Sequence, residues 1–198
     1  NNTLVLASLG WKGFWVGGEK LRFTVEERTP ASFCYLNEWI TLENITALTH
    51  RGLRAISANA LDVVSLDLDG NDIYFVERLL TDGIRPKLFI VEYNAKFPPP
   101  IAFQIAYDPQ HTWKEDDYFG ASLASFAALF ARFSYRLICC NSHSGANAFF
   151  VDDAHAGVFA DVPTDIGQIY VEPRYFFPNR YGHPQSTRTV ETIINGRR

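Results

Sequence analysis

Short apolar runs bounded by turn residues alternate along the chain with longer stretches in which apolar positions recur every three or four residues. This alternation is typical of strand and helix units packed around a sheet. The apolar runs predict strands over residues 13–16, 37–40, 61–66 and 86–92. The helical spacing predicts helices over residues 42–48, 73–80 and 122–133. The sequence therefore predicts an α/β fold with a mostly parallel sheet.

The second half of the chain adds three further features. Apolar runs at residues 136–140 and 148–151 flank a polar turn, which predicts an antiparallel hairpin. Residues 93–115 are aromatic and proline-rich and are too long for a simple linker, so we expect a lid or substrate loop there. Periodicity is lost from residue 154 onward. We therefore predict a domain over residues 1–153 and a C-terminal extension over 154–198 that wraps the domain or mediates self-association as a homo-oligomer.

Composition narrows the class of protein. A chain of 198 residues with 47% hydrophobic and 20% charged residues fits a compact globular fold. The formal net charge of -4 argues against a nucleic-acid partner, and no run approaches the roughly 20 apolar residues of a membrane span. The three cysteines match neither a disulfide framework nor a zinc site, so we expect a cytoplasmic setting. Because the chain contains no Met, we expect a fragment or a processed chain.

Polar side chains follow two of the predicted strands. Asp67 and Asp69 come after the strand at 61–66, and Glu92 and Asn94 end the strand at 86–92. Since the carboxyl ends of parallel strands meet at one edge of a sheet, these groups are expected to converge. Hard oxygen ligands of this kind suit Mg²⁺ or substrate hydroxyls. The competing interpretation is that acidic residues at a helix start, including Asp72, only cap the helix.

Two histidines in loops are candidates for a general base. His111 lies in the aromatic loop and His143 in the hairpin turn, and we favour His111. The alternative is that each is a solvated polar residue. The aromatic residues around His111 either stack on a sugar ring or an adenine base or form core beneath the loop; they are Tyr93, Phe97, Tyr107, Trp113, Tyr118 and Phe119.

Five blocks together resemble a known family. They are residues 2–15, 64–72, 90–94, 117–123 and 145–151, and they extend over about three quarters of the chain. In this order they resemble the FkbM-type S-adenosylmethionine-dependent methyltransferases. The resemblance implies the class I methyltransferase fold, a Rossmann-like sheet that ends in an antiparallel hairpin. It also implies methyl transfer to a hydroxyl of a small molecule or of a sugar or polysaccharide precursor, since many members are found with sugar or polysaccharide biosynthesis.

The strand-end positions and the resemblance together suggest roles for particular residues. Asp67, Glu92 and His111 are the expected catalytic residues, and Asp67, Asp69, Glu92 and Asn94 are the expected ligands if Mg²⁺ is used. The glycine-rich cofactor loop of the family precedes the segment that residues 2–3 resemble, so we expect an N-terminally truncated domain. The acidic ribose-binding residue of the family aligns with Gly17, and Glu19 lies two positions on. We therefore expect Gly17, Glu19 and Asp67 to contact S-adenosylmethionine.

Two alternatives stay open at this point. Without the glycine-rich loop, and with glycine at position 17, the chain can also be a methyltransferase-like binding module that does not catalyse. The run Asp67-Leu68-Asp69-Gly70 also matches the start of the haloacid-dehalogenase phosphatase signature, with Asp67 as nucleophile and Asp69 as acid/base. That signature normally continues with Thr or Val, whereas Asn71 follows here, and it usually opens the domain.

Overall fold

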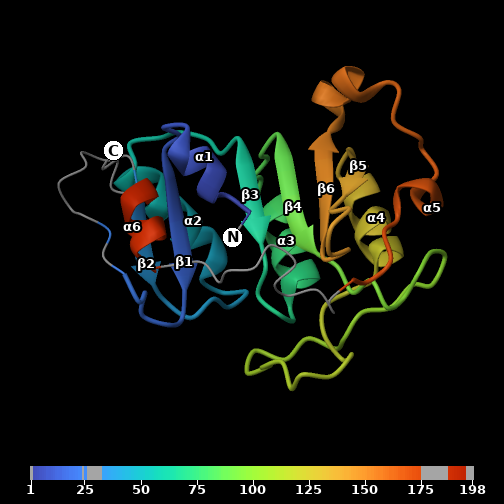
Figure 1. Cartoon of the computed structure of the whole chain (residues 1–198), viewed down its shortest axis with the longest axis horizontal. Helices are drawn as coiled ribbons and strands as arrows, with labels where there is room; N and C mark the ends of the chain where they lie inside the picture. The colour runs from blue at the N-terminus through green and yellow to red at the C-terminus, as the bar shows by residue number, and fades with distance from the viewer. Residues whose placement is uncertain (1, 24, 26–32, 175–186, 195–198) are drawn as a thin grey trace. The chain divides into compact units, whose positions relative to one another are not determined.

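A computed structural model of the chain describes residues 2–23, 25, 33–174 and 187–194 (Figure 1). The chain forms two compact units, one made of Asn1–Ala60 with Asn179–Arg198 and the other of Leu61–Pro178. Each unit has a sheet of its own, and both combine helices with strands, so the fold is α/β with mixed sheets. No helix within the described ranges combines the length and the apolar composition needed to cross a membrane.

The first unit contains a two-stranded parallel sheet. Its elements are α1 Leu4–Ser8, β1 Gly13–Gly17, β2 Phe33–Asn37, α2 Ile45–Ala55 and α6 Thr187–Ile194. β1 and β2 pair from Gly13 opposite Phe33 to Gly17 opposite Asn37. α2 packs closely on β1, because a Cβ added at Gly52 would lie 2.3 Å from the ring of Phe14. Gly52 is thus the place where this helix meets the sheet.

The strand predicted at residues 37–40 is found earlier, as β2 at Phe33–Asn37. The helix predicted at residues 42–48 is found later, as α2 at Ile45–Ala55. The Asn44 side chain explains both shifts. Its Oδ1 accepts a hydrogen bond from Thr41 N at 2.8 Å, and its Nδ2 donates to Trp39 O at 2.8 Å. These two bonds fold residues 39–44 into a turn that follows β2 and ends where α2 begins at Ile45.

The second unit contains a four-stranded mixed sheet in the order β3-β4-β6-β5. Its elements are β3 Val63–Leu66, α3 Asp72–Thr81, β4 Leu88–Glu92, α4 Leu123–Ala131, β5 Tyr135–Cys140, β6 Asn147–Asp152, the 3₁₀ helix η1 Asp153–Phe159 and α5 Ile166–Ile169. β3 and β4 are parallel, whereas β6 runs antiparallel to both of its neighbours. The predicted hairpin is therefore confirmed as β5 and β6, and its second strand lies between β4 and β5.

Aromatic packing under β4 holds this sheet together. Phe89 of β4 is fully buried, and its ring lies 5.3 Å from that of Phe130 on α4. Phe130 in turn stacks on Phe150 of β6, with ring centroids 4.1 Å apart. Offset and tilted ring pairs of this kind are favourable beyond the apolar area that they bury. The β4 and β6 strands of this sheet are thus packed against α4.

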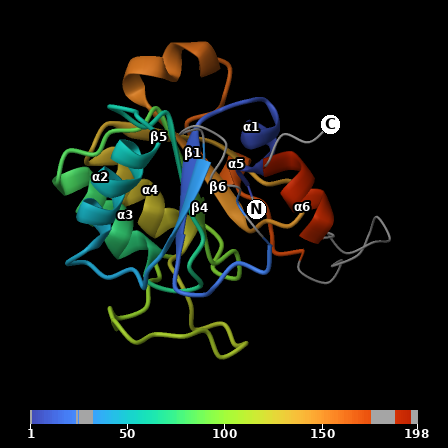
Figure 2. The ribbon, with the colours of Figure 1, turned by 90° about the vertical axis from the view of Figure 1, so that its left-hand side faces the viewer.

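The segment between β4 and α4 forms a long loop. In both views this yellow-green segment extends beyond the carboxyl ends of β3 and β4 (Figures 1 and 2). This is the segment that the sequence predicts to be a lid or substrate loop. Asn94 fastens its two ends together, because Nδ2 donates to Asp117 O at 2.9 Å and to Phe119 O at 3.0 Å.

Residues 154–174 of the predicted C-terminal extension belong to the second unit, whereas α6 belongs to the first. Tyr93 Oη donates to Val171 O, and Tyr170 Oη donates to Ala95 O, both at 2.6 Å. Arg174 N donates to Ser144 O at 2.9 Å. Residues 166–174 therefore wrap the end of β4 and the hairpin turn, while residues 175–186 and 195–198 of the predicted extension lie outside the described residues.

Candidate functional site

Three carboxylates meet at the carboxyl ends of β3 and β4. Asp67 directly follows β3, Glu92 is the last residue of β4, and one carboxylate oxygen of each, with one of Asp69, lies within 4.8 Å of the others. The parallel register, with Leu66 opposite Val91, places the two strand ends side by side. Asp69 adopts a left-handed conformation, with φ 55, that is better tolerated by Asp than by most residues. The predicted convergence of these three residues is thus confirmed.

The electrostatic state of this carboxylate cluster favours a proton or a cation. Partial burial, followed by the charges of Asp67, Asp72 and Asp69, raises the pKa of Glu92 from 4.5 to about 9. Partial enclosure and then the charge of Asp69 also raise the pKa of Asp67, although much of this residue remains exposed. None of the ion pairs found among the described residues involves the cluster. Hard oxygen donors of this kind fit Mg²⁺.

Asp72 shapes the loop that carries two of these carboxylates. It is 1% exposed, and its carboxylate accepts hydrogen bonds from Leu68 N at 3.0 Å and Gly70 N at 3.1 Å. Burial is the main reason why its pKa rises from 3.8 to about 7. Both oxygens accept hydrogen bonds from backbone amides of the loop before α3, so Asp72 has a structural role in that loop rather than the helix-capping role of the competing interpretation.

His111 packs against the loop that carries the cluster. A Cβ added at Gly70 would lie 2.3 Å from Cδ2 of the His111 ring. The Nε2 atom of His111 is buried and has no hydrogen-bond partner among the described residues. An unprotonated imidazole nitrogen can in general accept a proton from a hydroxyl. His111 therefore packs against the loop that carries Asp67 and Asp69, but it does not belong to the cluster of possible metal ligands.

Asn94 and His143 are placed elsewhere. Asn94 is fully buried, and besides the two bonds of its Nδ2 its Oδ1 accepts from Lys96 N at 3.2 Å. Since these contacts hold the long loop, we leave Asn94 out of the set of metal ligands. His143 is exposed in the turn between β5 and β6, where its backbone amide donates to Asn141 Oδ1 at 2.9 Å.

The predicted cofactor contacts Gly17 and Glu19 lie at the end of β1 in the first unit. Gly17 O accepts hydrogen bonds from Tyr35 Oη at 2.8 Å, from Asn37 Nδ2 at 3.0 Å and from Glu38 N at 3.0 Å. Tyr35 Oη also donates to Glu19 O. A Cβ at Gly17 would lie 2.9 Å from Tyr35 Oη, so packing accounts for this glycine. The Glu19 side chain is exposed.

The predicted aromatic stacking set divides into core and surface. Tyr93 is fully buried and Phe119 is 7% exposed, so both are core, as one of the two interpretations held. Trp113 and Tyr118 are 47% and 51% exposed. The exposed rings lie in the same long loop as His111. Phe97 and Tyr107 are partly buried, so Trp113 and Tyr118 are the most exposed rings of the set.

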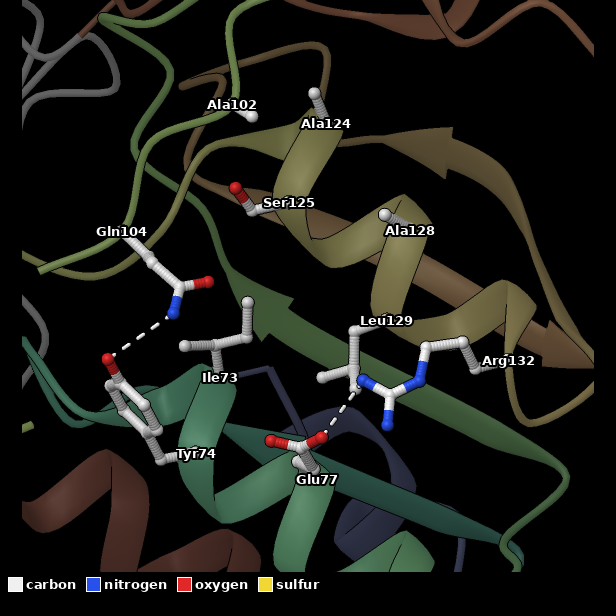
Figure 3. Close-up of a pocket in the computed structure, with 10 residues that line it drawn as sticks. All are labelled: Ile73, Tyr74, Glu77, Ala102, Gln104, Ala124, Ser125, Ala128, Leu129 and Arg132. Atoms are coloured by element: carbon white, nitrogen blue, oxygen red, sulfur yellow. Dashed lines mark hydrogen bonds and ion pairs between the residues drawn. The ribbon is translucent and has the colours of Figure 1, made fainter.

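A groove of about 310 Å³ lies between α3 and α4, apart from the carboxylate cluster (Figure 3). An ion pair of 3.0 Å between Arg132 and Glu77 crosses it, and a bond of 3.3 Å joins Gln104 Nε2 to Tyr74 Oη. Small side chains of α4, Ala124 and Ala128, form part of its wall. None of the residues predicted for the site lines this groove.

The chain was compared with protein-family models, with characterised proteins and with solved structures, and none of the three comparisons gave a match.

Proposed function

We propose that the protein is an S-adenosylmethionine-dependent O-methyltransferase that acts on a hydroxyl of a small molecule or of a sugar or polysaccharide precursor. The observation that carries this proposal is the meeting of Asp67, Asp69 and Glu92 at the carboxyl ends of two parallel strands. The neighbouring β5–β6 hairpin supports it, because the resemblance implies a sheet that ends in this way. The same proposal includes the fold that the resemblance implies, which is a mostly parallel, Rossmann-like sheet.

The chain's own groups would align and deprotonate the acceptor. When bound, S-adenosylmethionine supplies a methyl group on a sulfonium centre, and the enzyme then chiefly has to align the nucleophile and take its proton. Asp67 and Glu92 bind and orient the acceptor hydroxyl, and His111 Nε2 accepts its proton. If Mg²⁺ is used, Asp67, Asp69 and Glu92 hold it, and it lowers the pKa of the bound hydroxyl.

The first test is a calorimetric titration of S-adenosylhomocysteine into the protein with and without Mg²⁺, followed by methyl-transfer assays on hydroxylated acceptors. We expect binding in the micromolar range. In the assays, Asp67→Asn and Glu92→Gln should each lower the transfer rate about 100-fold, which is the loss expected when a reacting group is no longer held in place. Circular dichroism should show that both variants remain folded.

The matched control is Asp161→Asn, which neutralises an exposed carboxylate that follows η1. It should transfer at the wild-type rate. Full activity in either Asp67→Asn or Glu92→Gln would overturn the proposed roles of these residues. Hydrolysis of a phosphate ester that depends on Asp67, without binding of S-adenosylhomocysteine, would favour the phosphatase alternative.

A second candidate function is a binding module that does not catalyse. The observation that favours it is that side chains of the first unit fill the space at the end of β1. The Tyr35 hydroxyl lies against Gly17, and a Cβ at Gly18 would lie 2.6 Å from the Trp39 ring. A folded protein that binds neither S-adenosylhomocysteine nor Mg²⁺ would shift the conclusion to this candidate.

A further inference from the structure

Asn71 stands at the N-cap of α3 but does not cap the helix. An Asn at this position usually accepts a hydrogen bond from an amide in the first helical turn. Here its side chain makes no such bond, although the residue is only 8% exposed. The buried carboxamide is therefore used for something other than the start of the helix.

The Asn71 side chain binds the long loop instead. Its Nδ2 donates to Asp108 O at 2.7 Å, and its Oδ1 accepts from Asp108 N at 3.3 Å. One turn further along α3, Tyr74 Oη donates to Ile105 O at 2.7 Å. α3 thus fastens residues 105–108 at two points, and the sequence separation of 37 residues between Asn71 and Asp108 makes this a tertiary contact.

The fastened segment continues directly into His111. His111 N donates to Asp108 O at 3.0 Å, so the carbonyl that Asn71 binds also closes the turn to His111. This turn brings the imidazole against Gly70, where any larger residue would collide with it. Asn71 and Gly70 are neighbours in the loop that carries Asp69. In this short loop, Asn71 therefore binds the backbone of the turn that leads to His111, and Gly70 leaves space for the His111 ring.

We propose that Asn71 is a positioning residue, which fastens the 105–108 segment to α3 and thereby holds the His111 imidazole against Gly70 beside the acidic loop. The fastening itself is independent of any activity. Its catalytic consequence rests on the proposed function, in which His111 accepts the proton of the acceptor hydroxyl.

The fastening is tested first by amide hydrogen exchange in the Asn71→Ala variant of the whole chain. Each net hydrogen bond contributes about 1 kcal/mol, so losing both should speed exchange at the amides of Asp108 and His111 about tenfold or more. The buried amides of β4 should keep their protection. Unchanged exchange at Asp108 and His111 would overturn the proposal whatever the protein catalyses.

The matched control is Asn44→Ala. Asn44 also stands at a helix N-cap without capping it, and its side chain also binds backbone groups of a preceding turn. Its removal should speed exchange at Thr41 and leave Asp108 and His111 unchanged. Faster exchange at Asp108 in the control would show that the response is not specific to Asn71 and would overturn the proposal.

The catalytic consequence is tested by a double-mutant cycle once transfer is measured. Asn71→Ala should lower kcat about tenfold and leave the KM for S-adenosylmethionine unchanged. In the His111→Ala background it should have no further effect, because a residue that acts through His111 has nothing left to position. Additive losses would overturn the positioning role. An inactive wild-type protein would refute the proposed function but leave the exchange result to decide the fastening.

A second variant approaches the same contact from the other side. Gly70→Ala adds a methyl group where the His111 ring lies, and it leaves Asn71 unchanged. It should lower kcat in the wild-type background and have little effect in the His111→Ala background, where the ring is absent. Equal losses in both backgrounds would show that Gly70 matters for another reason and would count against the proposed position of His111.

Discussion

At the residue scale, the state of Glu92 decides what the carboxylate cluster can do. This side chain is half-buried at the end of β4, beside two other carboxyl groups and without an ion pair among those described. Burial and like charges both disfavour its ionised form. The cluster is therefore stable with a proton on Glu92 or with a bound cation, and it is strained electrostatically when all three groups are ionised.

The first prediction concerns stability against pH in Glu92→Gln. The folded state holds the Glu92 proton more tightly than the unfolded chain, since the pKa rises from 4.5 to about 9. This contribution to the free energy of unfolding is complete below about pH 4.5 and is lost as the pH rises towards 9. Because Gln stays neutral, the Tm advantage of the variant should grow from pH 5 to pH 9, by about 2–4 °C for each kcal/mol.

Scanning calorimetry across this pH range measures the effect. Added Mg²⁺ should raise the Tm of the wild type at pH 8 and have a smaller effect on Glu92→Gln, which has lost one charged ligand. Glu115→Gln, at an exposed position in the long loop, is the control and should follow the wild-type curve. A wild-type Tm that rises with pH relative to Glu92→Gln would contradict the sign of the predicted dependence.

At the element scale, the sequence predicts best what burial alone determines. The runs that form β3, β4, β5 and β6 are apolar enough to be recognised without a structure, and β4 and β6 in particular are mostly buried. β2 was misplaced because the turn made by Asn44 is set by side-chain bonds, which leave no periodic pattern. The position of β6 between β4 and β5 depends on pairing between distant segments, so local sequence does not reveal it.

The same distinction applies to the candidate site. Asp67, Asp69 and Glu92 were predictable because strand ends define their places. The roles of Asn94 and Asn71 were not, because both depend on the path of a loop that contacts residues more than 20 positions away. An Asn before a helix predicts a cap, and only the tertiary contact with Asp108 shows that Asn71 does something else.

An element-scale prediction concerns residues 166–174, which two tyrosine hydroxyls hold over the end of β4. The double variant Tyr93→Phe/Tyr170→Phe removes the bonds to Val171 O and Ala95 O. Each lost bond costs about 1 kcal/mol, so exchange at the Arg174 amide should become about tenfold faster or more. Tyr135→Phe removes a bond from a buried hydroxyl to Pro86 O and serves as control, because it should leave Arg174 protected. Equal exchange in the double variant and the wild type would contradict this role of the two hydroxyls.

At the scale of the whole molecule, the chain consists of two compact units, each with its own sheet. The predicted contacts with the cofactor are divided between them: Gly17 and Glu19 belong to the first, whereas Asp67 belongs to the second. Units with separate cores can open separately, and local opening is then confined to the unit that is destabilised. The first unit offers a test, because Gly52 of its helix α2 lies in close contact with Phe14 of its sheet.

Gly52→Ala tests this independence. The added methyl group would collide with the Phe14 ring, and overpacking of this kind costs about 1–3 kcal/mol. Exchange should therefore become faster in β1 and α2, while amides of β4 and β6 keep their wild-type rates. Gly157→Ala is the matched control, because a Cβ there would meet nothing within 4 Å and both units should then keep their protection. If Gly52→Ala instead speeds exchange equally in β4 and β6, the two units unfold together, and residues at the end of β1 can influence the carboxylate cluster through stability alone.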